Sequence, residues 1–155
     1  MEPDLRAAWL AAARAPEICA GLKAVYQVIA DQIEARGPAC WASGRCCNFE
    51  KTGHRLYVTG LEAAYTLTRV DRPLAQADID TARARGDCPF LSLNVCSVHT
   101  IKPIGCRVYF CDRSAQDWQK DLSERVLELV RKLHDRHAIP YRYGEWRGML
   151  ALLSV

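Results

Sequence analysis

The stretch CPFLSLNVCSVHTIKPIGCRVYFC, residues 88–111, decides how this chain is organised. It contains four cysteines, and its prolines and glycine interrupt any helical or strand periodicity. A second window, CWASGRCC at residues 40–47, contains three more cysteines. Seven of the eight cysteines of the chain therefore lie in two short windows. They are Cys40, Cys46, Cys47, Cys88, Cys96, Cys106 and Cys111.

The N-terminus indicates that these thiols stay reduced. The chain begins with the acidic stretch MEPD, and Arg6 and Arg14 interrupt the apolar run that follows. A secretory signal needs a basic start and an unbroken apolar stretch, so the sequence predicts no signal and a cytoplasmic location. In that compartment, metal or redox chemistry explains grouped cysteines better than a disulfide framework does.

The cysteine spacing bears on which metal would be bound. Zinc takes four sulfur or nitrogen donors, commonly from paired C-x2-C knuckles, and iron–sulfur clusters take a cysteine sulfur at each iron. Ser43 stands three residues after Cys40, so no such knuckle is present, and the ferredoxin C-x2-C-x2-C run is absent too. An all-thiol, unevenly spaced set favours an iron–sulfur cluster, with zinc as the alternative.

The number of thiols leaves the architecture of the site open. Seven thiolates are too many for one four-coordinate ion. The side chains of the adjacent residues Cys46 and Cys47 diverge, so they do not readily serve the same ion. The sequence therefore predicts a cluster, two sites, or one site with spare thiols.

Length and composition predict one domain, residues 1–155. Half of the residues are apolar and a quarter are charged, and a domain of this size buries roughly 70% of its unfolded surface. The net charge of +3 is too small for the concentrated basic face of a nucleic-acid-binding protein. No segment reaches the ~18 uninterrupted apolar residues of a membrane helix. We expect neither a nucleic acid nor a membrane as a partner.

Apolar periodicity divides the domain into a helical N-terminal segment (residues 1–37), a cysteine-cluster region (38–113) and a C-terminal helical segment (114–155). Pro16 suits the first turn of a helix that Gly37-Pro38 would stop, and Pro140 would end the C-terminal helix. Spacings of three and four residues put apolar side chains on one helix face. These are Ile18, Leu22, Val25, Ile29 and Ile33, and later Trp118, Leu122, Val126, Leu129, Val130 and Leu133.

Shorter elements are expected inside the cysteine-cluster region. Residues 55–58 are predicted to form a short strand, and Thr59 to Glu62 read as a capping box that opens a helix. Pro73 is predicted to open another helix that ends near Gly86, and residues 87–113 are predicted to be irregular. The expected fold class is mainly α, a small helical domain with two irregular cysteine-rich loops that converge on a metal site.

The cysteine blocks resemble those of the YkgJ-type cysteine-cluster family, described as zinc- or iron-chelating. That family shows C-x-x-C-x-x-C-C, then C-P-F-L, a later cysteine, and an ending similar to R-P-x-x-C-R-x-[FY]-x-C. The resemblance covers roughly residues 40–111. It implies a metal site formed by both windows. The matching residues here are Cys40, Cys46, Cys47, Cys88-Pro89-Phe90-Leu91, Cys96, Pro103, Cys106-Arg107 and Cys111.

The chain departs from that pattern at two places. Ser43 replaces the second cysteine of the first block, and a hydroxyl is a poor ligand for soft metals. Lys102 stands where the family often has arginine. These changes argue against an eight-thiol site and leave enough ligands for one complete site.

Several residues outside the cysteine blocks have alternative interpretations. Cys19 is expected to be a small buried hydrophobe rather than a ligand. Arg107 either lowers the pKa of nearby thiols or forms a surface ion pair. His99 is either a ligand beside Cys96 or a half-buried substitute for tyrosine. The C-terminal tail is predicted to pack on the helices through Trp146, Met149, Leu150 and Leu152.

Three classes of function follow from the cysteine set. The first is a metal-binding module that serves an unknown protein partner or small molecule, since no phosphate loop, nucleophile elbow or HExxH pair is present. The second is a small metalloenzyme that uses the cluster as a redox or Lewis-acid centre. The third is a thiol redox sensor that uses a spare thiol such as Cys47.

Overall fold

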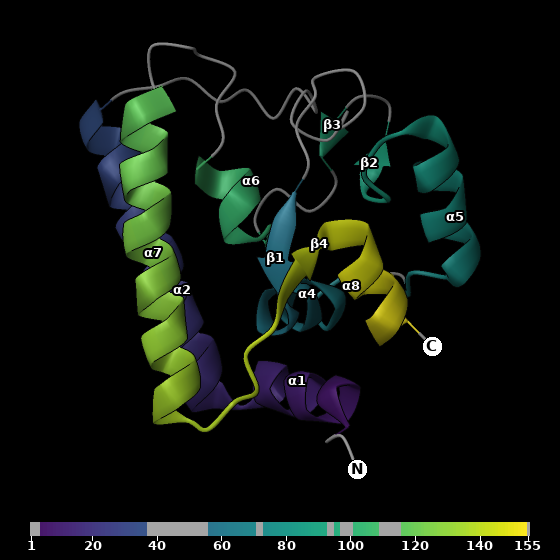
Figure 1. The fold of residues 1–155 in the computed structure, drawn as a ribbon, viewed down its shortest axis with the longest axis horizontal. Coiled ribbons are helices and arrows are strands. Elements are labelled where there is room, and N and C mark those ends of the chain that lie inside the picture. The colour runs from purple at the N-terminus through teal and green to yellow at the C-terminus, as the bar shows by residue number, and fades with distance from the viewer. Residues whose placement is uncertain are drawn as a thin grey trace.

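The computed structural model describes residues 4–36, 56–70, 73–92, 95–96, 101–108 and 116–154. Within these ranges the chain forms seven helices and two small antiparallel sheets (Figure 1). The predicted mainly helical class is confirmed. None of these helices combines the length and the apolar composition that a membrane span requires. The helices are α1 (Leu5–Arg14), α2 (Pro16–Arg36), α4 (Gly60–Leu67), α5 (Gln76–Arg85), α6 (Ile104–Val108), α7 (Gln116–Arg136) and α8 (Trp146–Leu153).

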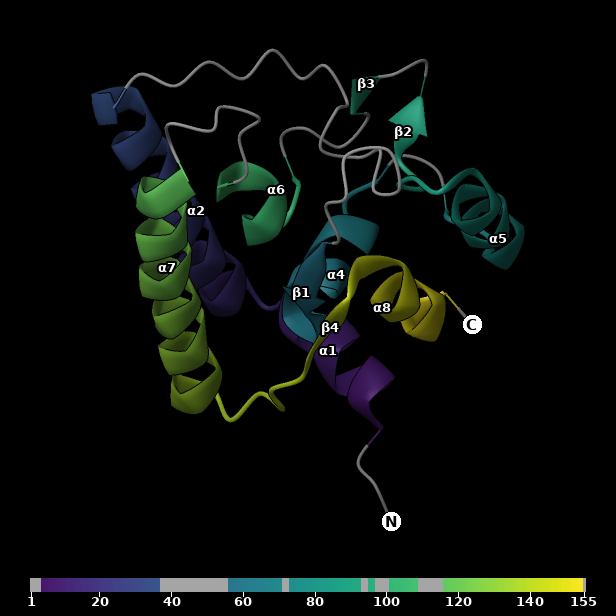
Figure 2. The same cartoon turned by 45° about the horizontal axis from the view of Figure 1, so that its top comes forward.

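Two long helices, α2 and α7, lie side by side and antiparallel at one flank of the molecule (Figures 1 and 2). Their predicted apolar faces are confirmed, because most of these side chains are buried and the rest are partly buried against the core. As predicted, Pro16 is the first residue of α2. The buried members are Ile18, Leu22, Val25, Ile29, Leu122, Val126, Val130 and Leu133.

A two-stranded ribbon lies at the centre of the remaining elements. It pairs β1 (Tyr57–Thr59) with β4 (Tyr143–Glu145) in the antiparallel register Val58↔Gly144. Helices α4, α6 and α8 contact this ribbon, and α1 packs against α4 and α8 (Figure 1). The indole Nε1 of Trp9 in α1 donates a hydrogen bond of 2.9 Å to the carbonyl oxygen of Pro140, just before β4. The first and last parts of the chain therefore share one core.

The boundaries of two helices and the buried residues of a third differ from the predictions. Helix α5 begins at Gln76 rather than at Pro73. The Asp78 carboxylate accepts a hydrogen bond from the Ala75 N–H and so caps the first turn of the observed helix. Helix α7 ends at Arg136, before Pro140, and Ala138 turns the chain at a φ of 53°. In α8 the buried residue near the end is Leu153, while Leu152 is exposed.

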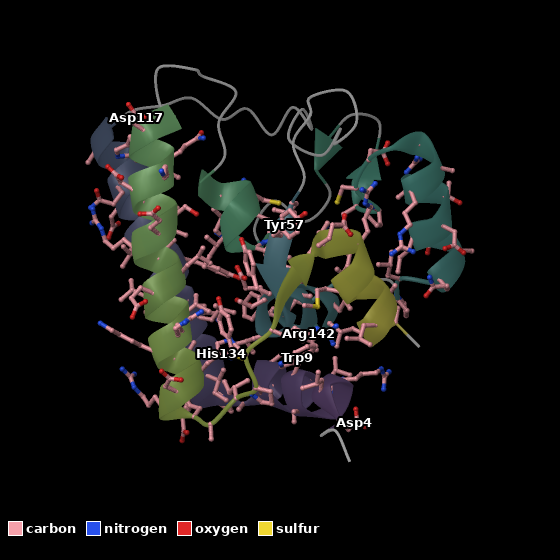
Figure 3. The ribbon with its side chains drawn as sticks, in the orientation of Figure 1. Asp4, Trp9, Tyr57, Asp117, His134 and Arg142 are labelled. Atoms are coloured by element: carbon pink, nitrogen blue, oxygen red, sulfur yellow. The ribbon has the colours of Figure 1, made fainter. Side chains whose placement is uncertain are left out.

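His134 lies buried near the end of α7 and points toward the chain that leads into β4 (Figure 3). Its Nδ1 is 3.3 Å from the carbonyl oxygen of Ile139, which can only accept, so Nδ1 carries the proton. The buried Nε2 has no partner among the described residues, and the ring contacts Tyr141 edge-on. Burial lowers the pKa of His134, although its backbone contacts oppose this.

We predict that His134 makes the protein less stable in acid. Because the pKa is lowered in the folded state, the unfolded chain takes up the proton first. The favourable contribution is complete above the ordinary value of about 6.5 and is lost as the pH falls toward the folded-state pKa, at up to ~1.4 kcal/mol per pH unit. Urea unfolding between pH 7.5 and 5 should show this slope. His134→Gln should flatten it and His137→Gln should not, and equal slopes in all three proteins would contradict the assignment.

Candidate metal centre

Cys88 lies between the end of α5 and the first strand of a small hairpin. Gly86 ends α5 in the left-handed conformation, with a φ of 79°, which turns the chain toward the core. The Cys88 side chain is a free thiol with only 3% of its surface exposed. The indole Nε1 of Trp146 donates a hydrogen bond to its sulfur over 3.2 Å. This sulfur is therefore buried beside a hydrogen-bond donor.

The segment after Cys88 is more regular than predicted. Strands β2 (Leu91–Ser92) and β3 (Val95–Cys96) form an antiparallel hairpin, in which Cys96 pairs with Leu91. Helix α6 then covers residues 104–108. The prediction of an irregular stretch over residues 87–113 is wrong for these elements. They were missed because strands of two residues and a helix of five show no usable periodicity.

Cys106 lies in α6, and only 8% of its surface is exposed. Two bonds from α4 hold the surrounding segment. The Ile104 N–H donates to Glu62 Oε1 over 2.8 Å, and the Thr66 hydroxyl donates to the Ile101 carbonyl oxygen over 2.7 Å. The position of Cys106 is therefore set by a helix that lies about forty residues earlier in the sequence.

Glu62 is the residue that joins these two helices. The predicted capping box is confirmed, because Glu62 Oε2 accepts from the Thr59 N–H and from the Thr59 hydroxyl, each over 2.9 Å. The sequence did not reveal the third bond, from Ile104. Burial raises the pKa of Glu62, while the bonds from Thr59 and Ile104 and the charge of Arg107 oppose the rise.

Arg107 follows Cys106 and is not confined to the surface. Its guanidinium carbon lies 3.8 Å from the ring centre of Tyr26 in α2, and its Nε donates to the Lys102 carbonyl oxygen over 2.7 Å. Burial lowers the pKa of Arg107, while the nearby phenol of Tyr26 and the Cys106 thiol oppose the shift. A positive charge therefore lies close to Cys106.

Leu56 links the Cys88 and Cys106 segments. Its carbonyl oxygen accepts a 2.9 Å hydrogen bond from the backbone N–H of Trp146. The indole N–H of the same tryptophan donates to the Cys88 sulfur. The Leu56 side chain lies so close to Gly105 that a Cβ there would overlap Leu56 Cδ1. Helix α6 and the β2–β3 hairpin both lie toward the end of the ribbon that Tyr57 occupies (Figures 1 and 3). Leu56 is therefore linked to the Cys106 segment through Gly105 and to Cys88 through Trp146.

The structure describes three of the seven predicted ligands. The structure describes Cys88 and Cys106 with their side chains and Cys96 by its backbone. In the described ranges, no three side chains of His, Cys, Asp or Glu lie close enough together to hold a metal ion. The other predicted ligands, together with the candidate His99, lie outside the described residues. These ligands are Cys40, Cys46, Cys47 and Cys111.

Cys19 is buried in the core, as predicted, but its sulfur is not merely packed. It donates to the Ala13 carbonyl oxygen and accepts from Arg69 Nη2, each over 2.9 Å. The Arg69 guanidinium also lies 3.8 Å from the ring centre of Tyr65. Cys19 therefore belongs to a polar contact between α1, α2 and the end of α4, separate from the cysteine segments.

No protein-family model, curated protein or solved structure matches this chain.

We predict that Glu62→Gln weakens the attachment of α6. All three partners of the carboxylate are donors, and an amide would turn an NH2 group toward one of them. Leaving a buried donor unpaired costs about 1–3 kcal/mol, and urea unfolding should show a loss of this size. Asp78→Asn makes the same exchange in the capping bond of α5, which is exposed, and should cost less. Equal losses in the two variants would contradict a special role for Glu62.

Proposed function

We propose that this chain is a metal-binding cysteine-cluster module, in which thiolates from residues 40–47 and 88–111 hold an iron–sulfur cluster or zinc. One observation carries the proposal. Cys88 and Cys106 are both buried, and Leu56, just before β1, is near both: its side chain packs against Gly105, and its carbonyl oxygen accepts from the backbone of Trp146, whose indole contacts Cys88. In the sequence, Leu56 follows the first cysteine window, residues 40–47, by nine positions.

The surroundings of the two buried sulfurs fit thiolate chemistry. A thiolate in a buried place needs hydrogen-bond donors or cations to offset its charge. Cys88 receives the indole N–H of Trp146, and Cys106 lies near the guanidinium of Arg107. Both cysteines therefore have neighbours that a ligand thiolate requires. The donor alone does not identify a ligand, since Cys19, which lies outside the cysteine segments, also accepts a hydrogen bond from Arg69.

The resemblance to the YkgJ-type family supports the same conclusion. The blocks that carry it include Cys88, Cys96 and Cys106. Cys96 lies in the hairpin that follows Cys88, and Gly105, beside Cys106, packs against Leu56. We retain the preference for an iron–sulfur cluster because the set is rich in thiols and lacks paired zinc knuckles. The molecule that such a module serves is an unknown protein or small molecule.

We predict that the purified protein contains bound iron. The protein purified anaerobically should be brown and contain iron together with acid-labile sulfide. Elemental analysis and sulfide release measure both. A colourless protein with stoichiometric zinc and no sulfide would replace the cluster by zinc. A protein that holds neither metal after anaerobic reconstitution would contradict the proposed function.

The ligand set is tested by cysteine substitution. Cys88→Ser and Cys106→Ser should each lose most of the bound metal, because a hydroxyl binds soft metals poorly. Cys19→Ser is the matched control, since it changes another buried thiol that lies outside the cysteine segments. It should keep its metal, and elemental analysis of the three folded variants measures the difference. Equal metal loss in all three folded variants would contradict the assignment of Cys88 and Cys106, rather than Cys19, to the ligand set.

A further inference from the structure

The indole N–H of Trp146 donates a hydrogen bond to the Cys88 sulfur in the interior of the protein. Both side chains are almost fully buried, with 1% and 3% of their surfaces exposed. A buried indole N–H needs a partner, because leaving it unpaired costs free energy. A neutral thiol is only a weak acceptor, whereas a thiolate carries a full negative charge. The acceptor that the fold provides for this indole N–H is the Cys88 sulfur, 3.2 Å away.

A second buried indole of the core, that of Trp9, has a different kind of hydrogen-bond acceptor. The indole N–H of Trp9 donates to the carbonyl oxygen of Pro140 over 2.9 Å, which is an ordinary strong acceptor. Both indoles lie in one apolar cluster and both find a partner. Trp146 differs in that its partner is sulfur, at 3.2 Å and 58 residues away in the sequence.

The position of the Trp146 indole is fixed by neighbours on several sides. Its backbone N–H donates to the Leu56 carbonyl oxygen over 2.9 Å, and Glu145 caps the helix that it begins. Its ring lies 5.9 Å from the ring of Phe90, two residues after Cys88. The donor is thus oriented before any metal binds, which is what a second-shell hydrogen bond requires.

We propose that Trp146 is a positioning residue of the metal centre, whose indole N–H holds the Cys88 sulfur and regulates how strongly it donates to the metal. This inference rests on the proposed function. An N–H donor draws electron density from the sulfur, so less charge passes to the metal. The metal–sulfur charge-transfer band then lies at higher energy, and the reduced state of a redox-active centre is favoured.

The decisive comparison uses three full-length proteins: wild type, Trp146→Phe and Trp9→Phe. Each variant removes one buried indole N–H and keeps an aromatic ring, but only one of these groups touches Cys88. The absorption spectrum is recorded with the bound iron, or with Co2+ in place of colourless zinc. Trp146→Phe should shift the charge-transfer band to lower energy and weaken Co2+ binding about tenfold. Trp9→Phe should leave both unchanged.

Failure of this inference can be distinguished from failure of the proposed function. If all three proteins bind metal with the same band and affinity, the proposed function stands and the role of Trp146 is wrong. If the wild type gives no sulfur-to-metal band with either metal, the proposed function is wrong as well. Equal shifts in both tryptophan variants would indicate a general loosening of the core and would also overturn the role of Trp146.

A measurement on the unaltered protein covers the case in which Trp146→Phe does not fold. In protein loaded with 113Cd2+ and labelled with 15N, a hydrogen bond to a ligating sulfur carries scalar coupling from the metal to the donor proton. The Trp146 indole proton should show this coupling, and the Trp9 indole proton should not. Bound cadmium without coupling to Trp146 would overturn the inference.

Discussion

The buried carboxylate of Glu62 is the constraint on which the arrangement of the cysteine segments depends. Its two oxygens receive three donors, from the backbone and hydroxyl of Thr59 and from the backbone of Ile104. Burying a carboxylate is costly unless donors surround it, and here the same donors start α4 and fix α6. Oε2 thus bonds a residue three positions away in the sequence, and Oε1 bonds a residue 42 positions away. It places Cys106 relative to the ribbon before any metal is considered.

The ribbon provides the second anchor, and it connects the C-terminal helix to the cysteine segments. Strand β1 pairs with β4, so α8 begins next to Leu56. Trp146, the first residue of α8, consequently faces Cys88 rather than solvent. The tail predicted to pack on the helices does so, and its first residue also contacts a predicted ligand. Through this contact, the last described helix becomes part of the surroundings of the candidate site.

The features predicted correctly from the sequence are those encoded by neighbouring residues. The faces of α2 and α7 recur every three or four positions, and the Thr59–Glu62 box is complete within four residues. The β4 strand was missed because three residues carry no periodic signal and its pairing is distant. For the same reason the sequence predicted Cys88 as a ligand but not Trp146 as its neighbour. Side-chain partners across a core depend on topology, which local patterns do not encode.

Charge balance explains why such distant neighbours matter for a thiolate site. Several thiolates gathered around a metal leave net negative charge in a place with little water, and that charge must be offset by fixed donors or cations. The described cysteines use different means. Cys106 has a guanidinium nearby that is itself stacked on Tyr26, and Cys88 has a neutral N–H dipole. A full charge stabilises a thiolate over a longer distance, whereas a hydrogen bond acts on one sulfur and depends on its direction. Under the proposed function, Arg107 would therefore affect the whole centre and Trp146 would affect one metal–sulfur bond.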